Sequence, residues 1–155
     1  PEEILKDMLV EKGLTFATAE SCTGGNIAHR FTMLPGASDV FAGGVVSYAN
    51  EVKINVLGVE AGIIATLGAV SEPVAAAMAE GACRVLGTGC AVATSGIAGP
   101  GGGTPDKPVG TVCMAFATPA GTHTVTVHLP GDRGRVIDRA STTALIGMIK
   151  ALSTL

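Results

Sequence analysis

The stretch TAESCTGG, Thr18–Gly25, joins an apolar run to an amphipathic run, and the architecture of the chain follows from that junction. Residues 14–20, LTFATAE, are predicted to form a short buried strand, and residues 22–34 contain a helix. Gly24 and Gly25 would let a bound molecule approach the backbone of the turn. The junction is therefore either a strand-to-helix turn that presents a nucleophile or a capped helix start.

Strand and helix patterns alternate in the first half of the chain, and two adjacent strands follow later. Gly43 and Gly44 in the second strand indicate a bulge or the close approach of another segment. This order predicts a mixed sheet of about five strands, covered by helices on both faces, within a single domain of residues 1–155. The expected helices are 2–12, 22–34, 50–58, 60–66, 71–87 and 132–152, with Asn50 and Ser71 as N-caps, and the expected strands are 14–20, 41–49, 90–98, 109–118 and 123–129.

The composition favours closely packed layers. Hydrophobic residues make up 47% of the chain, which argues against disorder, whereas aromatic residues make up only 3%. The core must therefore be built from Ala, Val, Ile, Leu and Met, and small side chains let helices and strands approach closely.

The net charge and the cysteines limit the partners and the cellular compartment that we expect for this chain. The net charge is −3 and no basic block is present, which argues against nucleic acid as a partner. No apolar run approaches the ~18 residues of a membrane span, and the acidic N-terminus does not resemble a signal peptide. The cysteines at 22, 83, 90 and 113 lack C-x-x-C spacing, so we expect free thiols, no metal site, no membrane association and a cytoplasmic location.

Ser21 is the first candidate for chemistry, because it stands where the buried strand meets the helix. The first amides of that helix, aided by the helix dipole, would stabilise an oxyanion beside the serine. The alternative is that Ser21 or Thr23 is only an N-cap. Cys22 is a rival nucleophile, since thiols at helix N-termini are activated, although no histidine is placed to serve it.

The stretch SYANEVK, residues 47–53, carries the second candidate site. If the short helix that contains Lys53 docks beside Ser21, the lysine loses water, its pKa falls and it can accept the proton of the serine. Tyr48 would then orient the lysine or relay the proton. The alternative is an ordinary solvated lysine.

The stretch SGIAGPGGGTPDKPVGT, residues 95–111, is the third candidate. A glycine-rich loop after a buried strand turns backbone N–H groups toward an anion, although the loop matches neither the P-loop nor the dinucleotide fingerprint. A flexible connector is the alternative. Because the carboxyl ends of parallel strands meet at one edge of an open sheet, all three candidate sites are expected to meet there.

Five stretches occur in the order typical of one family. They are TAESCTGG (18–25), GVVSYANEVKINVLGV (44–59), GAVSEPVA (68–75), SGIAGPGGGTPDKPVGTV (95–112) and LPGDR (129–133). Over residues 3–152 the sequence resembles the C-terminal domain family of the competence/damage-inducible protein CinA, whose stand-alone members are nicotinamide mononucleotide deamidases.

The resemblance implies a three-layer α/β/α sandwich with a mostly parallel sheet. It also implies an amidohydrolase that converts nicotinamide mononucleotide to nicotinate mononucleotide and ammonia, without a cofactor or a metal, in pyridine nucleotide salvage. By position in the motifs, Ser21 is the nucleophile, Lys53 the base and Tyr48 a nearby hydroxyl. The implied substrate contacts are Cys22, Thr23, Gly24, Gly25, Gly99, Gly101, Gly102, Gly103, Thr111 and Arg133.

The sequence departs from the family pattern at Ile137, where a second arginine is expected four residues after Arg133. Arg135 and Arg139 flank this position and are the substitutes to consider. A different interpretation of the whole chain is a non-catalytic nucleotide-binding module, in which Ser21 only caps its helix. The small-residue helices and high apolar content lead us to expect a homo-oligomer.

Overall fold

Five strands form one mixed sheet in the computed structural model, which describes residues 1–155. In spatial order they are β2 (Phe41–Val46), β1 (Phe16–Glu20), β3 (Cys90–Gly96), β4 (Thr111–Thr118) and β5 (Gly121–His128). β1 pairs in parallel with both β2 and β3, whereas β4 pairs antiparallel with β3 and with β5. The predicted mixed five-stranded sheet and the predicted hairpin are therefore confirmed.

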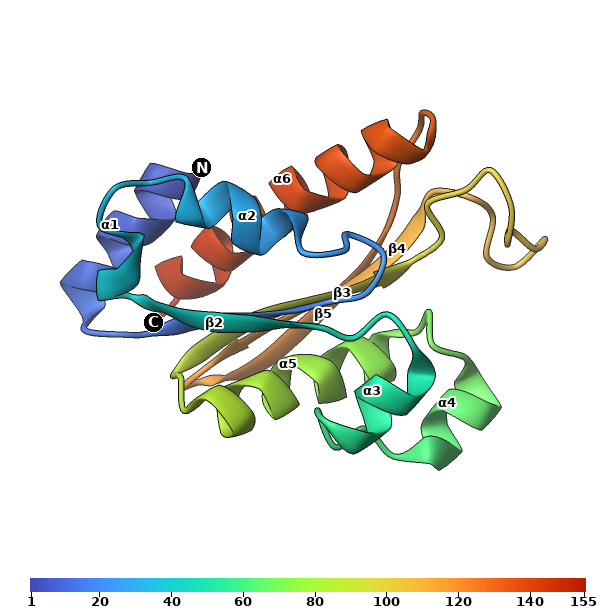
Figure 1. Cartoon of the computed structure of the whole chain (residues 1–155), viewed down its shortest axis with the longest axis horizontal. Helices are drawn as coiled ribbons and strands as arrows, with labels where there is room; N and C mark the ends of the chain where they lie inside the picture. The colour runs from blue at the N-terminus through green and yellow to red at the C-terminus, as the bar shows by residue number, and fades with distance from the viewer.

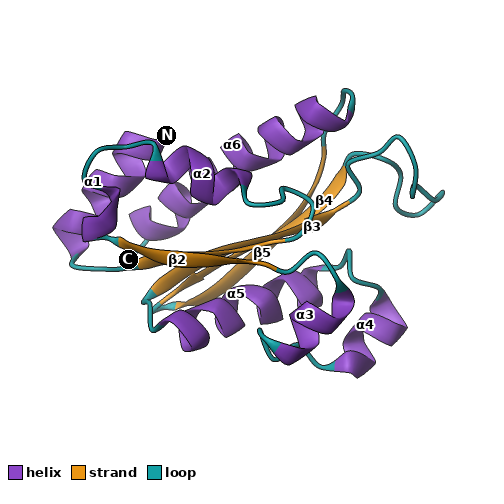
Figure 2. Cartoon of the chain, in the orientation of Figure 1, coloured by secondary structure: helices purple, strands orange, loops and turns teal.

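Helices cover both faces of the sheet, so that the chain forms the three layers that the resemblance implied (Figure 1). Figure 2 shows the strands edge-on between the two helical layers. One layer contains α1 (Glu2–Lys12), α2 (Asn26–Thr32) and α6 (Arg133–Ser153), and the other contains α3 (Asn50–Asn55), α4 (Ala61–Leu67) and α5 (Glu72–Leu86).

Strict alternation along the central strands separates two cores of different character. In β4, Val112, Met114 and Phe116 face the layer of α1, α2 and α6, whereas the intervening Cys113 and Ala115 face the layer of α5. Large side chains fill the first core, but alanines dominate the second. Helix α5 itself presents alanines to this second core, so that it lies close against the sheet, as the low aromatic content predicted.

The second strand contains both features that its glycines indicated. Phe16 pairs with Phe41 but Ala17 pairs with Gly43, so that one extra residue makes a bulge in β2. A Cβ atom on Gly44 would lie 2.1 Å from Thr18 Oγ1 of the neighbouring strand, which makes this a close approach as well.

Of the two predicted N-caps, Asn50 is wrong and Ser71 is confirmed in its position. Asn50 is the first residue of α3, and Ala49 holds the N-cap position without a side-chain hydrogen bond. Ser71 does hold the N-cap position of α5, but its hydroxyl donates to the carbonyl of Gly68 at 2.9 Å and does not cap the helix. Side-chain capping competes with such local turn hydrogen bonds, and in α5 the turn bond forms instead.

The three parallel strands all end at the same edge of the sheet, where the loops that follow them converge. Ser21 extends β1 by donating its amide to Thr94 of β3, and Ser47 extends β2 by donating its amide to the carbonyl of Glu20. None of the helices is long and apolar enough to cross a membrane.

Two helical glycines give a matched test of how closely α5 packs against Leu57, which follows α3. A Cβ atom on Gly81 in α5 would lie 2.0 Å from the carbonyl oxygen of Leu57, whereas a Cβ on Gly62 in α4 would meet nothing within 4 Å. We expect Gly81→Ala to lower the free energy of unfolding by about 2 kcal/mol or more, because backbone cannot yield cheaply. Gly62→Ala should raise it by roughly 0.5 kcal/mol through helix propensity. Urea unfolding measures both, and equal effects would contradict the close approach of α5 to the backbone of Leu57.

Candidate active site

Ser21 is the first residue after β1 and lies at the floor of the convergent loops. Its amide donates to the carbonyl of Thr94 at 2.9 Å, and its carbonyl accepts the amide of Gly24 at 3.0 Å. The main chain around the serine is therefore held on both sides, which fixes the point from which its side chain projects.

Lys53 lies directly behind Ser21. The lysine projects from α3 and its side chain is only 1% exposed. Its Nζ lies 3.1 Å from Ser21 Oγ, 2.7 Å from the carbonyl oxygen of Ser47 and 3.2 Å from the carbonyl oxygen of Tyr48. No carboxylate lies within salt-bridge distance of the amine. Burial therefore lowers the pKa of Lys53 below its ordinary value of 10.5.

The three partners of the amine suit both of its protonation states. A carbonyl oxygen only accepts, so the two protons of a neutral amine go to Ser47 and Tyr48. The lone pair is then left for the hydroxyl proton of Ser21. After the proton moves, the ammonium donates to the same three oxygens, so the transfer needs no rearrangement of heavy atoms.

A cavity of about 270 Å³ opens in front of the serine. Lys53 does not line it, so the serine separates the amine from the space where a ligand would sit. The lining residues come from the three convergent loops and the start of α6: Ser21, Cys22, Tyr48, Gly96, Ile97, Ala98, Gly99, Gly101, Gly102 and Arg133.

Arg133, the first residue of α6, closes one wall of this cavity. Its guanidinium donates to the carbonyl of Gly99 at 2.7 Å and to the phenol oxygen of Tyr48 at 3.0 Å. Tyr48 thus contacts Lys53 through its backbone carbonyl and Arg133 through its side chain. The expected orienting role toward the lysine would therefore belong to the main chain of Tyr48, because this residue is 60% exposed and its phenol lies at the arginine.

The glycine-rich loop leaves its amides free. None of the N–H groups of Gly99, Gly101, Gly102 and Gly103 has an acceptor within the chain. Gly99, Gly101 and Gly102 line the cavity, and Gly99 and Gly102 have positive φ of 85° and 89°. Gly103 packs against Val109 instead, where a Cβ would lie 2.9 Å from the backbone nitrogen. Free amides on a concave loop can bind an anion.

The start of α2 differs from the expectation. The amides of Ile27 and Ala28 donate to the carboxylate of Glu20 at 2.9 and 3.0 Å, so they are not free to stabilise an oxyanion. The alternative that Ser21 or Thr23 caps α2 is also wrong, because Gly25 holds the N-cap position. Within the turn, the amides of Cys22, Thr23 and Gly25 have no acceptor, whereas that of Gly24 is bonded to Ser21.

Both threonines implied by the resemblance use their hydroxyls inside the protein. Thr23 donates to Glu20 at 2.6 Å, and Thr111 donates to the carbonyl of Pro108 at 2.7 Å. Neither residue lines the cavity.

The arginines near the last helix have separate surroundings. Arg133 lines the cavity, whereas Arg139 donates to the carbonyl of Pro130 and Arg135 is exposed. Ile137, in the position of the missing arginine, packs against the core beneath α6. Neither flanking arginine lines the cavity in place of Ile137.

Cys22 lines the cavity beside Ser21, but its thiol is not activated. Burial raises the pKa of Cys22 to about 12, so the thiol stays protonated near neutral pH. No group of His, Cys, Asp or Glu side chains is arranged to hold a metal ion.

Sequence reasoning missed Glu20, and it included Gly96, Ile97 and Ala98 only as part of the candidate stretch 95–111, without naming them as site residues. A signal for Glu20 was present, since a carboxylate at the end of an apolar strand must find partners when it is buried. The other three directly precede the glycine-rich loop, so their place on the cavity wall followed from that of the loop.

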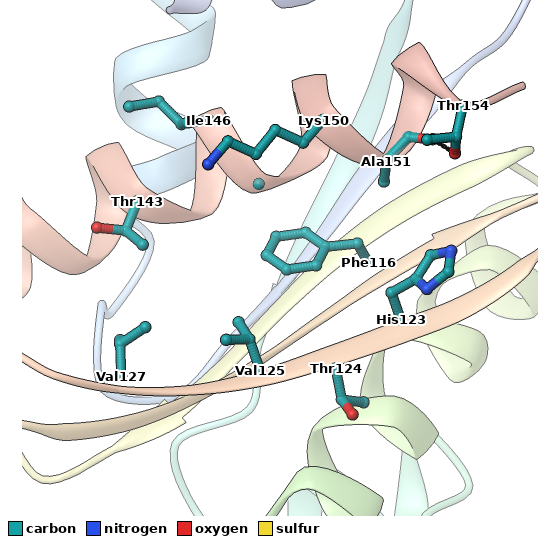
Figure 3. Close-up of a pocket in the computed structure, with 11 residues that line it drawn as sticks. Phe116, His123, Thr124, Val125, Val127, Thr143, Ile146, Lys150, Ala151 and Thr154 are labelled. Carbon is teal, nitrogen blue, oxygen red and sulfur yellow. Dashed lines mark hydrogen bonds between the residues drawn. The ribbon is translucent and has the colours of Figure 1, made fainter.

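A second cavity, of about 570 Å³, lies between β5 and α6, with Phe116, Val125, Ile146 and Lys150 in its lining (Figure 3). Its walls are mostly apolar, and none of the predicted site residues lines it. No hydrogen bond pairs a nucleophile with a base there, in contrast to the contact between Ser21 and Lys53.

Comparison with known proteins places this fold in one class. The chain belongs to the CinA C-terminal domain family, whose model matches residues 1–152. A putative competence-damage inducible protein of Symbiobacterium thermophilum is 54% identical over 147 residues, and a CinA-like protein of Mycolicibacterium gilvum is 56% identical over 142 residues. These alignments cover 89% and 91% of this chain but only 34% of either relative.

Solved structures agree with the fold over whole chains. A CinA superfamily protein from Klebsiella pneumoniae superposes with a TM-score of 0.94 at 33% identity and covers 99% of this chain and 98% of its own. A competence/damage inducible protein from Agrobacterium tumefaciens gives a TM-score of 0.88 at 39% identity, with 98% and 94% covered. The three-layer fold is therefore that of the family.

The buried amine predicts a pH dependence of stability. Between the lowered pKa of folded Lys53 and its ordinary value of 10.5, the unfolded chain binds the proton that the folded chain does not. The contribution of this site to the free energy of unfolding therefore rises with pH and falls as pH is lowered. Urea unfolding of wild type and Lys53→Met between about pH 7 and pH 10 should show a difference that grows with pH in favour of wild type. A constant difference would mean that the amine is charged in the fold.

Proposed function

We propose that this chain hydrolyses the carboxamide of nicotinamide mononucleotide to nicotinate mononucleotide and ammonia. The observation that carries the proposal is the contact of 3.1 Å between Ser21 Oγ and the buried amine of Lys53, which has no acidic partner. A serine beside a neutral lysine is an activated nucleophile. Membership of the CinA family supports the choice of substrate through the resemblance described above.

The first half of the reaction acylates the serine. Lys53 accepts the hydroxyl proton as Ser21 Oγ attacks the carboxamide carbon, and the carbonyl oxygen becomes an oxyanion. The free amide of Cys22, the residue after the nucleophile, is the donor we assign to this oxyanion. Lys53 then returns its proton to the leaving nitrogen, the C–N bond breaks and ammonia departs.

The second half releases the product. Lys53, again neutral, accepts a proton from a water that attacks the acyl carbon, and the proton then passes to Ser21 Oγ as the ester bond breaks. Each proton that Lys53 takes up is given back, so the enzyme ends unchanged. No other group is needed to balance the reaction.

The rest of the substrate lies along the glycine-rich loop in this proposal. The free amides of Gly101 and Gly102 and the guanidinium of Arg133 face the same cavity and suit a phosphate. The arginine also ties the loop to Tyr48, so that the phosphate site and the lysine site share one support.

Ser21→Ala tests the nucleophile. Ammonia release from nicotinamide mononucleotide should fall at least about 100-fold, because acylation loses its nucleophile and Lys53 is left without a hydroxyl proton to accept. Cys22→Ala is the matched control, since it removes the neighbouring thiol, and its rate should stay within about threefold of wild type.

A Ser21→Ala loss below about tenfold would contradict the mechanism, and loss of activity only in Cys22→Ala would favour a cysteine hydrolase. Calorimetric binding of the mononucleotide by wild type without any ammonia release would favour a binding module.

Arg133→Met tests the phosphate site. Loss of a charged, forked donor should raise KM for the mononucleotide at least about tenfold and change kcat less, because the phosphate is distant from the reacting carbon. Arg135→Met, two residues along α6 and outside the cavity, is the control and should leave KM within about twofold. Equal effects of both substitutions would show that Arg133 acts only through the general charge of the helix start.

A further inference from the structure

Glu20 is the residue immediately before Ser21, and its side chain is 1% exposed. No lysine or arginine lies within salt-bridge distance of it. A buried carboxylate without a cation costs stability unless hydrogen-bond donors surround it. Glu20 has three such donors, and all three come from the segment that follows Ser21.

The donors close the segment into a ring. The main chain leaves Glu20, passes through residues 21–25 and returns with the amides of Ile27 and Ala28 on the carboxylate. Thr23, in the middle of the segment, donates its hydroxyl to the same carboxylate at 2.6 Å. The nucleophile turn is therefore fastened at its midpoint and at its far end to the residue that begins it.

The carboxylate also sets the direction of a longer hydrogen-bond chain. Because a carboxylate only accepts, the Thr23 proton must point to Glu20, and the Thr23 oxygen can then accept from Thr94, 2.8 Å away. Thr94 lies in β3, and its backbone carbonyl holds the amide of Ser21. The network thus joins the turn to the neighbouring strand on both sides of the serine.

We propose that Glu20 is the positioning residue of this site: its carboxylate holds the turn 21–25 so that Ser21 Oγ stays beside Lys53 Nζ and the free amide of Cys22 faces the cavity. The inference rests on the proposed function, because it assigns Glu20 to the same nucleophile. Glu20 itself does not line the cavity, and it acts through the turn alone.

Glu20→Gln keeps the size of the side chain but replaces one acceptor oxygen by an N–H donor. Whichever way the new side-chain amide is turned, its NH₂ group faces the backbone N–H of Ile27 or of Ala28. Two donors then meet where a donor met an acceptor. We expect kcat for ammonia release to fall at least about 30-fold with KM changed less than about threefold, because a displaced nucleophile affects the reaction more than binding. Thr23→Val removes one donor without changing shape and should lower kcat about three- to tenfold.

Thr18→Val is the matched control. Thr18 lies on β1, two residues before Glu20, and its buried hydroxyl has no hydrogen-bond partner. The substitution makes the same chemical change as Thr23→Val without breaking the network, so kcat should stay within about twofold and thermal stability should not fall. If kcat of Thr23→Val stays within about twofold of wild type, as expected for Thr18→Val, the proposal is overturned. This comparison also decides the case in which Glu20→Gln does not fold.

Two readouts do not depend on the substrate. The rate at which a fluorophosphonate labels Ser21, followed by mass spectrometry, should fall in parallel with kcat in Glu20→Gln and Thr23→Val. If wild type is labelled at Ser21 but releases no ammonia, the proposed substrate fails and labelling still tests Glu20. Crystal structures of the variants decide the case in which wild type is not labelled either. A turn displaced from Lys53 supports the positioning role, and an unchanged Ser21–Lys53 distance contradicts it.

Discussion

An amine buried without an acid constrains the rest of this structure. Lys53 is almost completely removed from water, and only a serine hydroxyl and two backbone carbonyls surround its nitrogen. Such a group is stable in a folded protein chiefly when it is neutral, since burial penalises the charged form. Neutrality in turn gives the amine a lone pair, and the only partner that can supply a proton to it is Ser21. In the proposed mechanism, the electrostatic cost of burial is thus what makes the pair reactive.

The sheet provides the geometry for this arrangement. Parallel strands β2, β1 and β3 end together, so the loops that carry Tyr48, Ser21 and the free glycine amides converge without long excursions. Small residues on the α5 side of the sheet let the chain pack closely there, next to the short helix that carries Lys53. On the other face, Glu20 fastens the nucleophile turn to the start of α2. In the proposed mechanism the two faces of the sheet therefore contribute separately, one by supplying the base and the other by holding the turn.

Much of the fold could be predicted from local patterns, and the site only in part. The helices, the hairpin and the mixed sheet follow from apolar periodicity and from glycine and proline positions, which are properties of short windows. The location of Lys53 behind Ser21 depends on a contact between residues 32 positions apart. The sequence could therefore predict it only on the condition that the helix with Lys53 docks beside Ser21. The expected use of the α2 amides for an oxyanion failed for a related reason, because Glu20 reaches them seven and eight residues away. The roles of the threonine hydroxyls could not be predicted either. Sequence alone shows only that Thr23 and Thr111 lie in the motifs, whereas in the structure both hydroxyls donate to groups within the protein.

The charge of Lys53 is the quantity on which the account depends, and it can be measured directly. The protein would be labelled with ¹³C at lysine Cε, the Lys53 signal assigned by comparison with Lys53→Met, and its chemical shift followed by NMR as a function of pH. A neutral amine in the fold requires a midpoint below the ordinary value of 10.5. A Lys53 midpoint at or above 10.5 would show that the buried amine is charged under working conditions, and the serine would then have no base.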